Sequence, residues 1–240
     1  MLAAFIAAFV DSIVGGGGVI ALPALLAAGI PPHLALGTNK LAATGASIVA
    51  TMRYANAGYV HVPFVLGLIP FGVVGSFLGA ASVLLVDPWF IKGAVMVIMV
   101  VMTLYVAFKP KLGHEDRFTK IQAGQYAVCA VAITAIGFYD GFLGPGTGSL
   151  MLFLFLGVPQ FDFLRSAANG RVLNFATNMA ALVLFAIKDA IIYEIAVPML
   201  AAMLGGAYFG SHYGMKHGVG WVKPLFITMT TAILIRLAFF

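Results

Sequence analysis

The sequence predicts an all-α protein that crosses a membrane several times, and two observations support this fold class. The chain of 240 residues is 62% hydrophobic and only 9% charged, as expected of a polytopic membrane protein rather than an ordinary soluble domain. Apolar segments follow one another along the chain, and two of them are interrupted by glycine-rich stretches. We predict about eight hydrophobic segments in two related halves, with broken or re-entrant helices at both stretches.

The first glycine-rich stretch is the run Gly15, Gly16, Gly17 and Gly18, which follows Asp11 by one helical turn. Glycine inside a helix costs roughly 1 kcal/mol relative to alanine, so this run predicts a helix that ends and restarts. Such a break is tolerated at membrane depth where it lines a cavity, and its free backbone groups can bind a solute. Close packing of neighbouring helices at small residues is the alternative explanation.

The second stretch, 144–148, reads Gly-Pro-Gly-Thr-Gly and follows Asp140. Paired interruptions, one in each half of a chain, are the sequence sign of a transporter binding site. Further landmarks keep their order in the two halves, which indicates an internal repeat of about half the chain. These landmarks are Thr38-Asn39-Lys40 with Asn169-Gly170-Arg171, Pro63 with Pro198, and Gly72, Gly75 and Gly79 with Gly205, Gly206 and Gly210.

Windows of roughly 20 apolar residues, long enough to span a bilayer, divide the chain in order. The most polar stretch, 109–120, links an N-terminal membrane repeat, 1–108, to a C-terminal one, 121–240. If both broken segments are re-entrant hairpins, the two halves are inverted, whereas full crossings make them parallel. The positive-inside rule favours inversion, because it then keeps Arg53 and Arg165 on the side of the basic link. The windows cover about 2–28, 34–54, 61–86, 89–108, 123–156, 163–187, 191–213 and 221–240.

Lys40 and Arg171 lie just inside apolar windows, at matching places in the two halves. An ionisable residue inside a membrane costs at least ~2.5–3.5 kcal/mol, so it is functional by default, with snorkelling to a head group as the alternative. Two cations that converge on a cavity beside helix N-termini predict an anion site. The planar guanidinium suits an oxyanion such as a sulfonate, carboxylate or phosphate, and lysine adds a point charge.

Polar residues beside these cations complete the predicted substrate site. Their amides and hydroxyls can donate to anion oxygens, or they can bond neighbouring helices instead. Thr147 can also cap the restarted helix. The predicted substrate-binding residues are Lys40, Arg171, Asn39, Thr38, Gly16, Gly17, Asn169, Asn174, Gly146 and Thr147.

Asp11 and Asp140 form a repeat-related carboxylate pair that we assign provisionally to coupling, because carboxylates carry protons in membrane pumps. Pairing with Lys40 and Arg171, or capping of a half-helix, are the alternatives. An ionised carboxylate repels a nearby anion, so we expect both side chains to lie outside direct contact with the solute.

The remaining residues argue against other classes of site. The five histidines form no metal-binding pattern with one another or with the single cysteine, so we expect no metal. We find no motif for nucleophilic catalysis or nucleotide binding, and we therefore expect neither an enzyme nor a cofactor. The net charge of +5 is spread over loops and segment ends, which does not favour nucleic acid. We expect a small anionic solute and the lipid bilayer as partners, and leave a homo-oligomer open.

Five segments of the chain carry a resemblance to a known family. They are DSIVGGGGVI at 11–20 with Pro23, LGTNKL at 36–41, NAGYV at 56–60, GFLGPGTG at 141–148 and NFATN at 174–178. These segments resemble the sulfite exporter TauE/SafE family of bacterial and archaeal membrane proteins. The resemblance spans both halves, and the glycine-rich break followed by Gly-Thr-Asn-Lys is its most specific part. The second half has Gly170-Arg171 in place of a Thr-Lys-like pair, so it keeps the charge and lacks the hydroxyl.

The resemblance implies a multi-pass protein of the bacterial or archaeal inner membrane, with about eight segments in two related halves. It also implies transport of small sulfur-containing anions, such as sulfite or organosulfonates, often outward. The residues alone predict only a small anion. A passive anion channel and a membrane-embedded enzyme are the competing functions, and flux saturation or product formation would separate them from a transporter.

Overall fold

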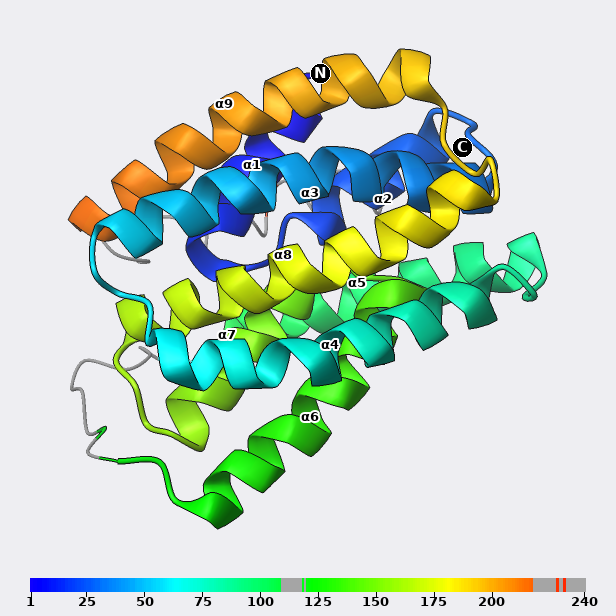
Figure 1. The fold of residues 1–240 in the computed structure, drawn as a ribbon. Coiled ribbons are helices and arrows are strands. Elements are labelled where there is room, and N and C mark those ends of the chain that lie inside the picture. The colour runs from blue at the N-terminus through cyan, green and yellow to red at the C-terminus, as the bar shows by residue number, and fades with distance from the viewer. Residues whose placement is uncertain (109–117, 119, 218–227, 229–230, 232–240) are drawn as a thin grey trace.

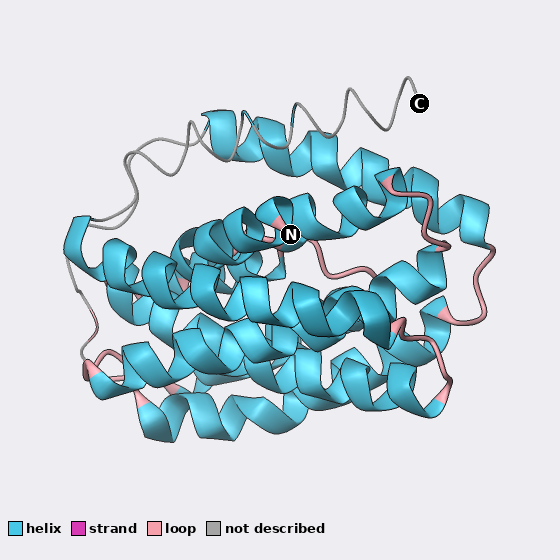
Figure 2. Ribbon diagram, turned by 90° about the horizontal axis from the view of Figure 1, so that it is seen from above, coloured by secondary structure: helices cyan, strands magenta, loops and turns pink. Residues whose placement is uncertain are grey.

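The computed structural model describes residues 1–108, 118, 120–217, 228 and 231, and this part of the chain is helical without strands (Figures 1 and 2). Nearly all of the polar link 109–120 and of the predicted window 221–240 lies outside the described residues, and the division into two repeats stays a prediction. The described helices are α1 (Leu2–Val14), α2 (Gly18–Ala27), α3 (Pro32–Asn56), α4 (Val62–Val83), α5 (Pro88–Phe108), α6 (Ala123–Phe142), α7 (Thr147–Gly157), α8 (Phe163–Ile187) and α9 (Tyr193–His217).

Four of the described helices, α4, α6, α8 and α9, are long and apolar enough to cross a membrane. The predicted all-α, polytopic fold class is therefore confirmed. Helix α3 is as long as α8, with 25 residues each, which corresponds to about 37 Å of helix. The residues of α3 are less apolar than those of α8. Helices α1, α2 and α7 are apolar but shorter, and each is too short to cross roughly 30 Å of hydrocarbon alone.

Both predicted helix breaks are present. Helix α1 ends at Gly15, whose φ of 86° lies in the left-handed region, and α2 begins at Gly18. The second break contains Gly144 and Gly146, with φ values of 90° and 84°. Only glycine takes these angles without strain from a Cβ atom, so both glycine clusters are needed for the chain to turn here.

Each short helix folds back along the helix that precedes it. Gly17 packs so tightly on Ala7 that an added Cβ would overlap the Ala7 carbonyl, although Ala7 lies two turns before the break. In the second half, Nε2 of Gln125 at the start of α6 donates to the carbonyl of Val158, just past α7, at 3.1 Å. A helix that continued straight would carry these residues far apart. The α1–α2 and α6–α7 units are therefore helical hairpins.

Helices α3 and α8 pack antiparallel at the centre of the molecule. Lys40 bonds Asn178, and Ser47, farther along α3, bonds Asn174, which comes earlier in α8. Figure 1 shows the same arrangement, with α3 and α8 running in opposite directions side by side. Consequently the turn from α3 to α4 and the turn from α8 to α9 lie at opposite ends of the bundle.

The two halves are interlocked, because helices of one half pack along helices of the other. Helix α4 lies against α6 and α8, while α9 lies against α1 and α3. Small residues let the backbones approach closely, as is usual between membrane helices. Similar glycine contacts occur in both packings: Gly75 with Thr134, Gly79 with Phe138, Gly206 with Phe5, and Gly210 with Phe9.

We predict that Gly79→Ala destabilises the protein, because the new Cβ would overlap the Phe138 carbonyl. Overpacking of this kind costs about 1–3 kcal/mol, so the Tm in detergent should fall by several degrees. Gly93→Ala on α5 is the matched control, since a Cβ there meets no atom within 4 Å and alanine favours the helix. Equal Tm values for the two variants would contradict this packing.

Candidate functional site

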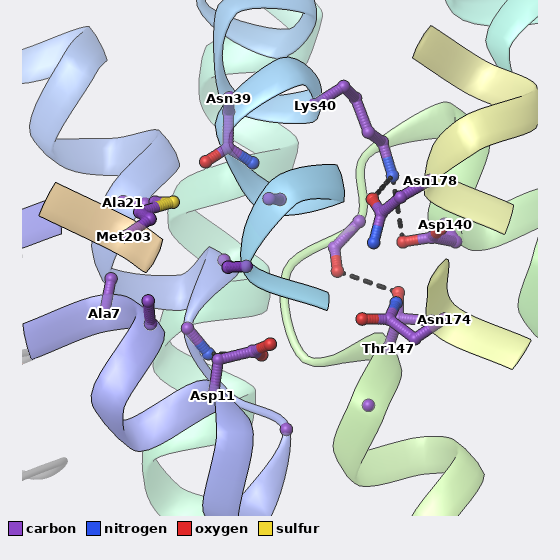
Figure 3. A pocket seen from close by; sticks show the side chains of 18 residues that line it. Ala7, Asp11, Ala21, Asn39, Lys40, Asp140, Thr147, Asn174, Asn178 and Met203 are labelled. Carbon is purple, nitrogen blue, oxygen red and sulfur yellow. Dashed lines mark hydrogen bonds and ion pairs between the residues drawn. The ribbon is translucent and has the colours of Figure 1, made fainter. Parts of the chain in front are cut away.

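A cavity lies where the two helix breaks meet (Figure 3). It contains about 450 Å³ of empty space, counting the part that opens to the outside. Residues of both hairpins, of α3 and of α8 form its wall, and Met203 of α9 also contributes. The polar side chains of the lining are Asp11, Asn39, Lys40, Asp140, Thr147, Asn174 and Asn178.

The two breaks touch through their backbones. A Cβ atom on Gly15 would overlap the backbone of Gly148 and Ser149. The amide of Ser149 donates to the Gly15 carbonyl at 3.2 Å, and its hydroxyl donates to the Val14 carbonyl at 2.8 Å. The last carbonyls of α1 are thus satisfied by the first turn of α7, as backbone groups away from water require.

Lys40 reaches the cavity from α3 and binds two residues of the other half. Its Nζ lies 2.9 Å from Oδ1 of Asp140 and 2.9 Å from Oδ1 of Asn178 (Figure 3). The residue is 2% exposed, yet it borders the cavity. An ammonium has three N–H donors, and the described residues accept from two of them.

Arg171 pairs with the other carboxylate. Its Nη1 donates to Oδ2 of Asp11 at 2.7 Å, and Oδ1 of Asp11 accepts from the Gly17 amide at 3.0 Å. Asp11 therefore both neutralises the guanidinium and holds the backbone just before α2. Arg171 itself is buried outside the cavity lining, with its guanidinium close to Gly148.

Each cation is matched by a carboxylate from the opposite half, so Lys40, Arg171, Asp11 and Asp140 together carry no net charge. Charge pairing and capping were the alternatives to a coupling role for the carboxylates, and the structure contains both. Asp11 and Asp140, which we expect to lie outside direct contact with the solute, both line the cavity. A buried cation needs its counter-charge nearby, which places the carboxylates here.

The structure gathers only some of the predicted substrate-binding residues around the cavity. Gly16, Thr38, Asn169, Gly146 and Arg171 are not among the lining residues. Those that line it are Lys40, Asn39, Gly17, Asn174 and Thr147.

Thr38 and Asn169 instead fix the starts of two helices in the opposite half. The Thr38 hydroxyl accepts from the Ile192 amide, just before α9, at 3.0 Å. Oδ1 of Asn169 accepts from the His61 amide, just before α4, at 2.9 Å. Thr147 borders the cavity, although its hydroxyl donates back to the Gly144 carbonyl at 2.7 Å.

Asn178 is the polar lining residue that the sequence analysis missed. It follows Asn174 by four residues, so both side chains lie on one face of α8. Four glycines outside the predicted set, at 15, 18, 144 and 148, also line the cavity. The four-residue spacing was the available signal, but Asn178 alone has no charge to mark it.

Several polar groups around the cavity lack partners within the described part of the chain. Oδ2 of Asp140 and Oδ1 of Asn39 are buried and accept no hydrogen bond there. The amides of Gly18 and Gly148, in the first turns of α2 and α7, likewise have no acceptor among the described residues. Among the described residues, residues that line the cavity therefore include two helix N-terminal amides and two buried side-chain oxygens without hydrogen-bond partners.

Comparison with known proteins identifies the family. A sequence model described as "Sulfite exporter TauE/SafE" matches residues 1–237. The chain belongs to the TauE/SafE sulfite exporter family. With several helices apolar enough to span a bilayer, this TauE/SafE member is a multi-pass membrane transporter.

Relatives within the curated proteins agree with this family. The chain is 37% identical to "Probable membrane transporter protein ORF9" of Sinorhizobium sp, over 98% of this chain and 90% of the relative. It is 34% identical to a "Probable membrane transporter protein" of Haemophilus influenzae, over 94% and 88%. It is 33% identical to "Probable membrane transporter protein YfcA" of Escherichia coli K12, over 98% and 87%. No solved structure matches the chain.

We predict that Lys40→Met lowers the free energy of unfolding by about 3–5 kcal/mol, because the buried Asp140 carboxylate loses its counter-charge. In the double variant Lys40→Met/Asp140→Leu no unpaired charge remains, so its loss should be smaller than the sum for the two single variants. Thermal unfolding in detergent measures all three. Additive losses would show that the pair is not coupled.

Proposed function

We propose that this chain is a secondary transporter of small sulfur-containing anions, such as sulfite or an organosulfonate, and that it exports them across the cell membrane. One observation supports an anionic solute above all. The cavity at the crossing of the two breaks combines the spare N–H of Lys40 with the free amides of Gly18 and Gly148.

These donors suit an oxyanion for two physical reasons. The positive ends of the α2 and α7 dipoles lie at the cavity, where they attract negative charge. A sulfite or sulfonate group has several oxygens, so it can accept from more than one of these donors. The amide groups of Asn39 and Asn174 also border the cavity and add polar contacts at its edge.

The arrangement of the helices supports alternating access by inverted repeats. Helices α3 and α8 occupy matching places in the predicted halves and run in opposite directions, as inverted repeats require. In this mechanism one half moves against the other around the central site. The glycine breaks act as hinges, because left-handed glycines allow a change of angle between the short helices and their partners.

Proteoliposome flux tests this function. We expect saturable uptake of sulfite and of ethanesulfonate, and weaker uptake of acetate and sulfate. Lys40→Ala should reduce uptake at least tenfold, because the donor in the cavity is lost. Arg171→Ala should also reduce uptake, because Asp11 becomes an unpaired negative charge in the cavity wall.

The matched control is Lys188→Ala, which removes an exposed lysine at the end of α8 and should keep full uptake. Wild-type uptake by the Lys40 variant would overturn the assignment of the cavity. Flux that rises linearly with concentration would favour a channel over a carrier.

Cysteine labelling tests the inverted arrangement. Single cysteines replace Gly58, in the α3–α4 turn, or Lys188, before α9, in a Cys129→Ala background. Because these turns lie at opposite ends of the bundle, a membrane-impermeant thiol reagent should label only one of them from outside intact cells. Equal labelling of both from one side would contradict the proposed topology.

A further inference from the structure

Asp140 presents a carboxylate oxygen that nothing in the described structure satisfies. The residue is 1% exposed, and its Oδ1 binds Lys40 while its Oδ2 has no donor. Asp11 differs, because the Gly17 amide and the Arg171 guanidinium engage one oxygen each. The two repeat-related carboxylates are therefore not equivalent, and of the two only Asp140 has a carboxylate oxygen without a partner among the described residues.

A bound anion cannot satisfy this oxygen. A sulfite or sulfonate group carries acceptor oxygens of its own, and two acceptors repel each other without a proton between them. Leaving a buried acceptor without a partner is destabilising, and more so when the acceptor is charged. A donor or a positive charge that enters with the solute would provide this partner.

The charged and titratable groups described around Asp140 are already engaged with other partners or with its Oδ1. Lys40 faces it from α3, Asp11 lies near Lys40 on α1, and Arg171 on α8 is held by Asp11. Tyr139, beside it on α6, donates its hydroxyl to the Pro145 carbonyl and has no proton to spare. Helices α4 and α7, which also pack against α6, contain no Asp, Glu, Lys, Arg or His.

We propose that Oδ2 of Asp140 binds one proton for each singly charged anion that the cavity carries, so that the two move together. This inference rests on the proposed function and names its coupling ion. A proton from solution forms an O–H bond on the carboxylate, and the same bond breaks when the proton leaves on the other side. No other bond changes.

Charge neutrality is the reason for this stoichiometry. The empty site is neutral, because two cations face two carboxylates. An anion alone would make it negative inside the membrane, which is costly. With one proton on Asp140 the loaded site is neutral again. Lys40, which still donates to Asn178, then forms its ion pair with the anion instead of with Asp140.

Proton movement in liposomes tests the coupling directly. The full chain is reconstituted in sodium-free potassium buffer with valinomycin to hold the membrane potential at zero, and a pH-sensitive dye is enclosed. Ethanesulfonate is the probe, since a sulfonate stays ionised throughout and cannot carry a proton itself. We expect inward ethanesulfonate flux to acidify the lumen by about one proton per anion.

Binding to the detergent-solubilised chain locates the proton. Because each anion binds together with one proton, ethanesulfonate binding by the wild type should weaken about tenfold per unit rise in pH over the alkaline range. Asp140→Asn cannot gain or lose this proton, so its binding should not depend on pH. The exposed control Glu194→Gln should keep the tenfold slope. A slope kept in Asp140→Asn would overturn the assignment.

The two proposals fail in different ways. If the vesicles take up neither sulfite nor ethanesulfonate, the proposed function is wrong and the proton site falls with it. If ethanesulfonate enters while the lumenal pH stays constant, or enters only after sodium is added, the proton site alone is wrong. Should Asp140→Asn fail to fold, the ratio of protons to anions in the wild type still decides whether one proton moves with each anion.

Discussion

The structure depends on one constraint: polar groups exposed by a helix break inside a membrane must find partners within the protein. Here the two breaks satisfy each other. Ser149 at the start of α7 donates through its amide and its hydroxyl to the last carbonyls of α1, and Asp11 accepts from the amide of Gly17. The glycines allow this contact, because any Cβ on Gly15 would collide with Gly148. The cavity lies where backbone amides of the two breaks have no acceptor among the described residues.

The same constraint explains why the halves exchange partners instead of each closing on itself. Lys40 binds Asp140 while Arg171 binds Asp11, so each carboxylate lies in the half opposite its cation. Thr38 and Asn169 likewise hold the helix that begins in the opposite half. Reciprocal contacts of this kind arise when two similar units meet about a two-fold axis. They place the site at the interface of the halves, where relative movement changes it most.

Much of this arrangement could be predicted from the sequence, because its signals are local. Four consecutive glycines can continue a helix only at a high cost in free energy. A lysine at position 40, within an apolar window, indicates a buried charge. Thr38 and Asn169 show what local signals miss. A hydroxyl or an amide beside a cation suits a solute, but the register of α3 and α8 directs these two to backbone amides of neighbouring helices. Which helix lies opposite is a property of the packing, which sequence spacing does not contain.

Two opposing electrostatic effects decide where the carboxylates lie, and reasoning from the sequence considered only one of them. Repulsion between a carboxylate and an anion argued for keeping Asp11 and Asp140 away from the cavity. The larger effect is the cost of two buried cations without counter-charges when the cavity is empty. A carrier must cross between its two orientations in both the empty and the loaded state, so its site must be tolerable in each. Paired carboxylates make the empty state neutral. The loaded state can be neutral only if a positive charge accompanies the anion, and we propose the unpartnered oxygen of Asp140 as its place.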